Sequence, residues 1–285
     1  MTTIRDDRVL PATRWAALAV FLILVAAAVV LWGSPGRTGD LWAWAIQPEL
    51  MAMFLGSGYG AGAYFFWRTA RAERWHPSAP GMLGAAVFAA LMLIATIIHW
   101  DRFNHGDAPG LAAIAFYGWT IVYIVSPPAV FALWWRNRAT DPGVPEPGDE
   151  AVPPGARLAA RVFGVGALAG GLLAFVVPQV AIDVWPWTLS PLTARVLASL
   201  TVEVGVAALM LSRDARWSTW KLLVQTYLVA TALLLIAAVR DFGAFDTGNP
   251  VTWVYLGGLL GTAAALGLLY ARMARTDAVA KLAVV

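Results

Sequence analysis

The stretch "DVWPWTLSPL", residues 183–192, repeats an earlier stretch of the chain, "DLWAWAIQPE", residues 40–49. Asp, Trp, Trp and Pro recur at the same spacing after an offset of 143 positions (183 − 40 = 143). The same offset pairs "RWAA" (14–17) with "RLAA" (157–160). A motif that recurs at a fixed offset indicates an internal repeat, so we expect the second half of the chain to be a diverged copy of the first.

The composition places the chain in a membrane. Hydrophobic residues make up 60% of the sequence and charged residues 13%, against about 45–50% and 25% in a soluble domain. Several apolar runs reach about 20 residues, the length that crosses a bilayer as a helix. Transmembrane β-barrels show short alternating segments instead, so the pattern predicts an all-α integral membrane protein.

Eight apolar runs are candidate transmembrane helices, and together with the repeat they predict a tandem 4+4 parallel arrangement. Their ranges are 14–32, 49–67, 81–100, 110–135, 158–178, 192–211, 219–239 and 251–270. We expect residues 1–138 and 157–285 to form the two four-helix repeats, joined by a flexible linker over 139–156 that is rich in Pro, Gly and acidic residues. The first run is longer than a usual signal core, and its partner in the repeat is internal, so we expect it to remain as a helix.

The distribution of basic residues predicts the orientation. With cytoplasmic termini, only four of the 20 basic residues lie on the outer side, namely Arg37, Arg102, Arg195 and Arg240, which leaves 16 inside. Cytoplasmic loops of membrane proteins are enriched in Lys and Arg. We therefore expect a multi-pass protein of the bacterial cytoplasmic (inner) membrane with both termini in the cytoplasm.

The doubled motif falls in the outer loop that follows the first helix of each repeat. Its tryptophans, Trp42, Trp44, Trp185 and Trp187, are expected to anchor the protein at the lipid headgroups, where amphipathic rings are enriched. The alternative is an aromatic cleft that reads a substrate. Glycine pairs with GxxxG spacing are expected to allow close helix packing; they are 56/60, 58/62, 166/170 and 257/261.

Glu203 is the most unusual residue, because it lies about 11 residues into the sixth expected helix and hence near the bilayer centre. A carboxylate there must face protein or water, find a partner or be protonated. One hypothesis is a proton or cation relay; the alternative is a carboxyl group hydrogen-bonded within the bundle. Arg195 and Ser199 precede it at spacings of four residues and form a polar stripe on the same helix. Arg195 lies too far from Glu203 for a direct ion pair and could instead reach the outer headgroups.

The stretch "HWDRFNHGD", residues 99–107, is the second candidate site. His99, Asp101 and His105 do not have a standard metal-ligand spacing, so no metal site is expected. Either a structural ion-pair cluster at the repeat interface or an outer vestibule for solute is consistent with the polar residues that fall on the outer side. These residues are His99, Asp101, Arg102, Asp40, Asp183, Arg240 and Asp241.

Several classes of chemistry are excluded or disfavoured. The chain has no cysteine, which removes disulfides, thiolate metal sites and iron–sulfur clusters. None of the three histidines falls in the middle of an expected helix, which disfavours haem, and no nucleotide-binding or hydrolase motif is present. We expect no cofactor, no nucleic-acid partner and no catalytic residue. The expected partner is the lipid bilayer, with a protein partner left open.

Three segments resemble an uncharacterised family of multi-pass membrane proteins from actinobacteria and related GC-rich bacteria. They are "FLGSGYGAGAYFF" (54–66), "TIIHWDRFN" (96–104) and "WPWTLSPLTARV" (185–196), and the resemblance covers about residues 14–270. It implies an eight-helix layout and a location in the cell envelope. It implies no activity and no functional residues.

Three hypotheses for the function follow. The first is transport of a small solute or ion, linked to protons through Glu203. The second is a non-catalytic membrane partner or scaffold subunit of a larger complex. The third is a membrane enzyme acting on lipid headgroups with His99 and Asp101, which requires the two side chains to converge on one cavity.

Overall fold

The computed structural model is a bundle of long α-helices. It describes residues 5–105 and 110–283, with side chains up to residue 275. No β-strand occurs in these ranges; two isolated bridges pair Arg8 with Arg74 and Ala151 with Arg216. The long helices are α1 (Pro11–Gly33), α3 (Glu49–Arg71), α4 (Ala79–Ile98), α5 (Gly110–Asn137), α6 (Pro154–Val176), α8 (Pro191–Ser212), α9 (Trp217–Arg240) and α10 (Pro250–Ala283).

Seven of these helices are long and apolar enough to cross a membrane: α1, α4, α5, α6, α8, α9 and α10. The exception is α3, which has 23 residues but contains four glycines, two tyrosines and charged residues at both ends. More than half of α3 is buried inside the bundle. A helix that neighbouring helices shield from lipid can hold small and polar residues, which explains its lower hydropathy.

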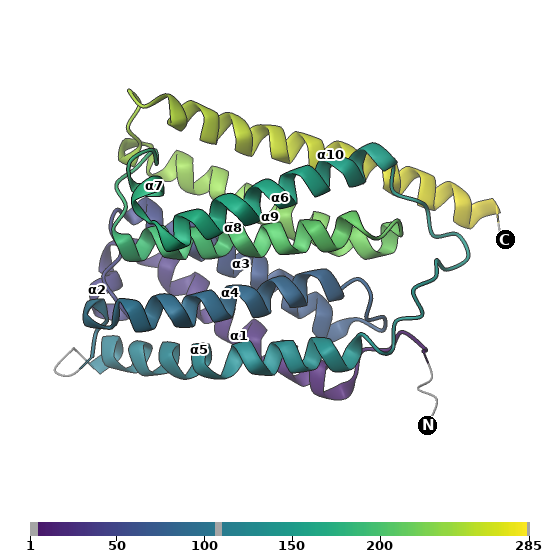
Figure 1. Ribbon diagram of the computed structural model, residues 1–285, viewed down its shortest axis with the longest axis horizontal. Helices are drawn as coiled ribbons and strands as arrows, with labels where there is room; N and C mark the ends of the chain where they lie inside the picture. Colours follow the sequence, from purple (N-terminus) through teal and green to yellow (C-terminus); the bar gives the residue numbers. More distant parts are fainter. Residues whose placement is uncertain (1–4, 106–109, 284–285) are drawn as a thin grey trace.

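The long helices lie side by side along the long axis of the molecule, and both chain termini emerge at the same end (Figure 1). We call this the terminal end. The opposite end holds the short helices α2 (Thr38–Leu41) and α7 (Gln179–Ile182), both at the left in Figure 1. The 3₁₀ turns η1 (Pro35–Arg37), η2 (Trp100–Arg102) and η3 (Phe242–Ala244) also lie in connections at the opposite end.

The bundle has four inner helices, α3, α4, α8 and α9, and four outer ones. The most extensive contacts are those of α6 with α8 and of α1 with α3, followed by α4–α8, α4–α5, α3–α9 and α9–α10. Each outer helix thus packs mainly on one inner helix. The outer helices expose large apolar side chains, among them Val29, Ile114, Val162 and Val254, as expected for surfaces that face lipid.

The tryptophans of the doubled motif do not face the headgroups, so the interpretation as lipid anchors is wrong for most of them. Trp42, Trp44 and Trp187 are less than a tenth exposed, and Trp185 is only partly exposed. Trp44 packs edge-on against Trp119 of α5, with ring centroids 4.8 Å apart. The rings close the opposite end of the bundle, because a large aromatic surface gains more from burial against other rings than from partial exposure.

The second copy of the motif builds an equivalent cluster. Trp187 packs edge-on against Phe245, which follows η3, and against Tyr255 of α10, at 5.5 and 5.3 Å. In the first copy, Trp44 likewise contacts Phe103, which follows η2, at 5.2 Å. A backbone hydrogen bond attaches each turn to its motif. In the first copy the amide of Asn104 donates to the carbonyl oxygen of Ala43, and in the second the amide of Asp246 donates to that of Pro186.

The linker between the halves is held at both ends, contrary to the flexible segment predicted for 139–156. The amide of Val152 donates to the carbonyl oxygen of Ala215 at 2.7 Å, and the amide of Trp217 donates to the backbone carbonyl oxygen of Glu150 at 2.9 Å. Thr140 accepts from the amide of Asp7 at 2.8 Å. The composition correctly predicts a loop. Its acidic residues, however, bind neighbouring segments: Asp141 binds Arg216, Glu146 binds Arg74 and Asp149 binds Ser218.

The close contact between α6 and α8 uses glycines outside the expected GxxxG pairs. At Gly205 of α8, an added Cβ atom would lie 2.7 Å from the backbone nitrogen of Leu168 in α6. Gly164 and Gly171 of α6 face α8 in the same way. By contrast, open space surrounds Gly166, Gly170, Gly257 and Gly261. In α6 the expected pair therefore lies on a face without a neighbouring helix. The expected pairs of α3 do allow close packing: a Cβ added at Gly56 would lie 2.7 Å from the Trp32 ring of α1, and one added at Gly60 would lie 2.9 Å from Leu233 of α9.

Candidate functional site

Glu203 lies in the middle of α8, inside the bundle. An added Cβ on Gly84 of α4 would lie 3.3 Å from the Cγ of Glu203, so the carboxylate stem passes directly over this glycine. Three tyrosines from α3, α5 and α9 are close enough to interact with it electrostatically: Tyr59, Tyr123 and Tyr227. The hydroxyl oxygens of Tyr59 and Tyr123 are hydrogen-bonded at 2.8 Å. The carboxyl group is thus within electrostatic reach of phenol groups from three other helices, and Glu203 is itself partly exposed.

No ion pair or hydrogen bond joins the carboxyl group of Glu203 to another residue in the described ranges. Arg195 pairs elsewhere, and the hydroxyl of Ser199 donates to the carbonyl oxygen of Arg195 at 2.7 Å within the same helix. Ser199 is fully buried and does not bridge Arg195 to Glu203. The three residues predicted as a polar stripe therefore do not form one hydrogen-bonded chain.

Arg195 contacts His99 across the α4–α8 interface. Nη1 of Arg195 lies 2.8 Å from Nε2 of His99. A guanidinium group has only donors, so Nε2 must accept and His99 must be neutral. Burial lowers the pKa of His99, and the charge of Arg195 lowers it further, while Asp101 opposes the shift.

None of the described residues in the "HWDRFNHGD" stretch forms a hydrogen bond or an ion pair with the imidazole of His99. Asp101 forms an exposed ion pair with Arg102 at 3.3 Å, and His105 stacks on Trp100. Residues 106 and 107 lie outside the described residues. In the described part of the chain no group of three His, Asp or Glu side chains could hold a metal ion.

The expected outer ion-pair cluster is not formed within the described residues, because its members have other partners. Asp40 lies 3.9 Å from Arg37, and Asp183 accepts from Gln179 at 2.5 Å. Arg240 donates to the carbonyl oxygen of Trp32 at 2.8 Å and lies over its indole ring. Asp241 forms no ion pair within the described residues. Charges counted on one side of a membrane need not be neighbours, because each can find a partner in its own loop or on another helix.

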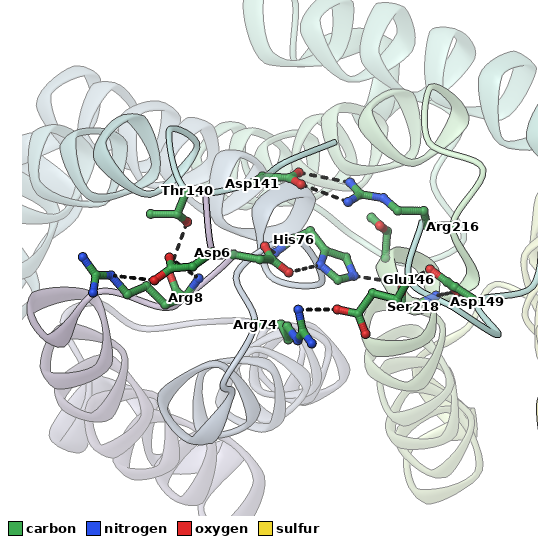
Figure 2. A network of polar contacts seen from close by, with 12 residues as sticks. Asp6, Arg8, Arg74, His76, Thr140, Asp141, Glu146, Asp149, Arg216 and Ser218 are labelled. Atoms are coloured by element: carbon green, nitrogen blue, oxygen red, sulfur yellow. Dashed lines mark hydrogen bonds and ion pairs between the residues drawn. The ribbon is translucent and has the colours of Figure 1, made fainter. Parts of the chain in front are cut away.

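Figure 2 shows a larger polar network at the terminal end, which sequence analysis did not predict. Its centre is a buried pair: both side-chain oxygens of Asp7 accept from His76, one from the backbone amide at 3.0 Å and one from Nδ1. Asp7 and His76 are only 2% and 3% exposed. Asp7 has a φ of 57°, a left-handed conformation that Asp tolerates better than most residues. The N-terminal segment is thereby fixed to the α3–α4 loop.

The network continues from the first half into the second. Nε2 of His76 lies 2.8 Å from the hydroxyl oxygen of Ser218 in the first turn of α9. Ser218 donates its hydroxyl to Asp149 of the linker at 2.5 Å and its backbone amide to the same carboxylate at 3.1 Å. Asp149 thus satisfies free donors at the N-terminus of α9, where a negative charge is favourable.

The order Asp7, His76, Ser218 is that of a hydrolase triad, but the geometry does not make Ser218 a nucleophile. Its hydroxyl hydrogen is directed to Asp149, whereas a nucleophilic serine gives its proton to the histidine. The adjacent pocket, of about 330 Å³, is lined by Asp7, Arg74, His76, Glu146 and other residues of the linker, and Ser218 is not among them. The arrangement holds four segments together instead.

Arg216 is the second connection between the linker and the second half. It forms a bidentate pair with Asp141 at 2.9 and 3.0 Å and contacts Asp214 at 2.6 Å. Burial alone would raise the pKa of both carboxyl groups, but the hydrogen bonds from Arg216 outweigh it and lower both. The same two carboxylates raise the pKa of Arg216 above its ordinary value despite burial. All three groups are therefore charged at neutral pH.

The network could not be predicted because its members are far apart in sequence. Asp7 and His76 are 69 positions apart, and His76 and Ser218 are 142 apart. The available signal was the presence of acidic residues in segments otherwise dominated by arginine. Sequence analysis used only the basic residues, as indicators of orientation.

The fold and these sites define a polytopic α-helical protein with a carboxyl group in the middle of its bundle. Comparisons with protein-family models, with curated proteins and with solved structures gave no match.

Proposed function

We propose that this protein is a transporter of a small solute or ion in the bacterial cytoplasmic membrane, linked to protons through Glu203. The observation that carries the proposal is the position of Glu203, in the middle of an apolar helix with no ion-pair or hydrogen-bond partner among the described residues. An ionisable group at membrane depth is costly and is most often retained for a function. Without a fixed counter-charge, such a carboxyl group can take up and release a proton as its surroundings change.

The proposed architecture is two four-helix halves related by a pseudo-two-fold axis, with α3 as an eighth span. In support, the contacts α1–α3 and α4–α5 have counterparts in α6–α8 and α9–α10. The contacts between the halves, α3–α9 and α4–α8, also exchange under this correspondence. Parallel repeats of this kind are known from transporters, where sites lie near the midplane at the interface between repeats.

The proposed orientation places the terminal end in the cytoplasm. It rests on the basic residues, 16 of 20 of which belong to segments on that side of the eight-span arrangement. Tyr59, Tyr123 and Tyr227 then lie around Glu203 within the membrane. Their phenol groups can donate to a carboxylate or accept from a carboxylic acid, so they can accompany either protonation state.

The test is a proton-flux assay. The purified protein is reconstituted into liposomes that enclose a pH-sensitive dye, and mixtures of small anions, cations and neutral solutes are added under a pH gradient. We expect solute-dependent proton movement that Glu203→Gln abolishes and that Glu73→Gln, a change to an exposed loop carboxylate, leaves intact. Identical flux from Glu203→Gln and the unchanged protein would contradict the proposal. A stoichiometric protein that co-purifies, together with absent flux, would favour the alternative role as a partner subunit.

A further inference from the structure

Arg195 is a half-buried cation without a carboxylate partner. No Asp or Glu oxygen of the described residues lies within 4 Å of its guanidinium nitrogens, whereas Arg216 has two carboxylate partners. The Nε of Arg195 is fully buried and has no hydrogen-bond partner. Removing a charge from water without compensation is costly, so this group is incomplete as it stands.

The contact with His99 does not compensate the charge. His99 presents the lone pair of a neutral imidazole to Nη1 and so satisfies one of five N–H donors without adding negative charge. The other charged groups that face His99 are Asp101 and Arg102, and they form an ion pair with each other at 3.3 Å. The surroundings of the α4–α8 contact at the opposite end are therefore electropositive.

Snorkelling to lipid headgroups does not describe this side chain. A snorkelling arginine extends its guanidinium out of the protein surface. Here Nε is buried, and Nη1 is directed at His99, the residue that follows α4. Helices α4 and α8 are both among the inner four of the bundle. The guanidinium is held between α4 and α8, with most of its donors available.

We propose that Arg195 and His99 form a binding site for an oxyanion, a carboxylate or phosphate group, which is the substrate class of the transporter. The claim that the bound oxyanion is the transported substrate rests on the proposed function. The claim that the site binds an oxyanion rests on the structure alone. A planar guanidinium matches an oxyanion through two parallel N–H donors, and this geometry explains why Arg rather than Lys is found at such sites.

The position relative to Glu203 fits this assignment. Arg195 and Glu203 are eight residues apart on α8, about 12 Å along the helix axis. An anion that enters at Arg195 and a proton that binds Glu203 add no net charge together. Moving a neutral pair through an apolar bundle avoids the cost of moving a lone anion.

The binding test uses the protonation of His99 as an internal probe. The chain has three histidines, so ¹⁵N-histidine labelling gives a spectrum that single substitutions can assign. The full-length protein in dodecyl maltoside micelles, which contain no phosphate, is titrated with inorganic phosphate at constant ionic strength. An oxyanion bound to Arg195 offsets the positive charge that disfavours imidazolium, so we expect a saturable shift of the His99 signals toward the protonated form.

Three variants make the result specific. Arg195→Gln should weaken the apparent affinity by roughly tenfold or more, because it removes a charge-assisted pair, whereas Arg195→Lys should retain part of it. Arg37→Gln, an exposed arginine that pairs with Asp40 in another loop, should leave the affinity nearly unchanged. Retention of a monodisperse elution profile shows that each variant is folded.

A second arm distinguishes a free anion from a lipid. The titration is repeated with phosphatidylglycerol added to the micelles. A shift with inorganic phosphate supports a site for free anions, and a shift only with the lipid supports a headgroup site of the same chemistry. No saturable shift in either arm, or equal shifts in Arg195→Gln, would overturn the proposal. Binding that persists in Glu203→Gln while proton flux is absent from every preparation would instead remove the proposed function and leave the anion site standing.

Discussion

Replacing Arg216 by Leu is expected to release the linker from the bundle. The arginine side chain is 8% exposed, and its partners Asp141 and Asp214 are 22% and 20% exposed. The substitution therefore leaves two mostly buried carboxylates without their cation. Removing one partner of a buried pair typically costs about 3–5 kcal/mol. Since about 1.4 kcal/mol corresponds to a factor of ten, the local opening equilibrium should shift by roughly two to three and a half orders of magnitude.

Hydrogen exchange at two backbone amides measures this opening directly. The amides of Val152 and Trp217 donate across the junction between the linker and the α8–α9 loop, so they exchange when the junction opens. We expect their protection in Arg216→Leu to fall by the factor above, or to be lost altogether if the native opening free energy is smaller. The matched control is Arg213→Gln, an exposed arginine in the same loop. Protection in Arg216→Leu within threefold of both the control and the unchanged protein would refute the reasoning.

Three further outcomes are expected. Gly205→Val should destabilise the protein by about 1–3 kcal/mol, because the new side chain would meet the α6 backbone. Gly166→Val, whose side chain would enter open space, should leave the stability unchanged. Thermal unfolding followed by tryptophan fluorescence compares the two variants. The linker should become less stable in acid, because the pKa values of Asp141 and Asp214 are lowered in the folded state. As the pH drops through the carboxyl range, the folded state then binds fewer protons than the unfolded state. Hydrogen exchange measured against pH checks this, and constant protection between pH 7 and 3 would refute it. Ser199→Ala should leave proton flux unchanged, because the Ser199 hydroxyl donates within its own helix. A flux defect equal to that of Glu203→Gln would instead mean that Ser199 and Glu203 act together.

The helices were predictable because membrane insertion imposes a simple rule on sequence. Backbone polar groups must be satisfied within the segment, so each apolar run of about 20 residues reads as one helix. The range 192–211 is observed as Pro191–Ser212, and 110–135 as Gly110–Asn137. Pro127 and Pro128 lie inside the latter helix. The range 49–67 is helical as predicted, but α3 is not apolar enough to be identified as a membrane span from composition.

Which face of a helix is buried was harder to predict, since apolar residues surround most membrane helices. The GxxxG spacing of Gly166 and Gly170 occurs on a face in open space, while Gly164 and Gly171 contact α8. The doubled tryptophans illustrate the same problem. Their preference for interfaces is a property of single rings, and it is outweighed where several rings can pack together.

For the candidate sites, single residues could be identified from the sequence, but their contacts could not. Glu203 could be found from sequence because a lone carboxyl group in an apolar run is conspicuous. Arg195 and His99 were both singled out, but their contact joins positions 96 residues apart and was not predicted. The Asp7–His76–Ser218 network was missed entirely, because polar residues in loops carry no periodic signal that would indicate which of them meet.

The most direct test of the central claim is an infrared titration of the protein in lipid, compared with Glu203→Gln. The account predicts a carboxyl C=O band that responds to external pH, is lost in Glu203→Gln and persists in Glu73→Gln. Such a band means that the carboxyl group in the middle of the bundle exchanges protons with water. A spectrum in which no pH-dependent band depends on Glu203 would mean that the group is locked in one protonation state, and it would contradict proton-linked transport through this residue.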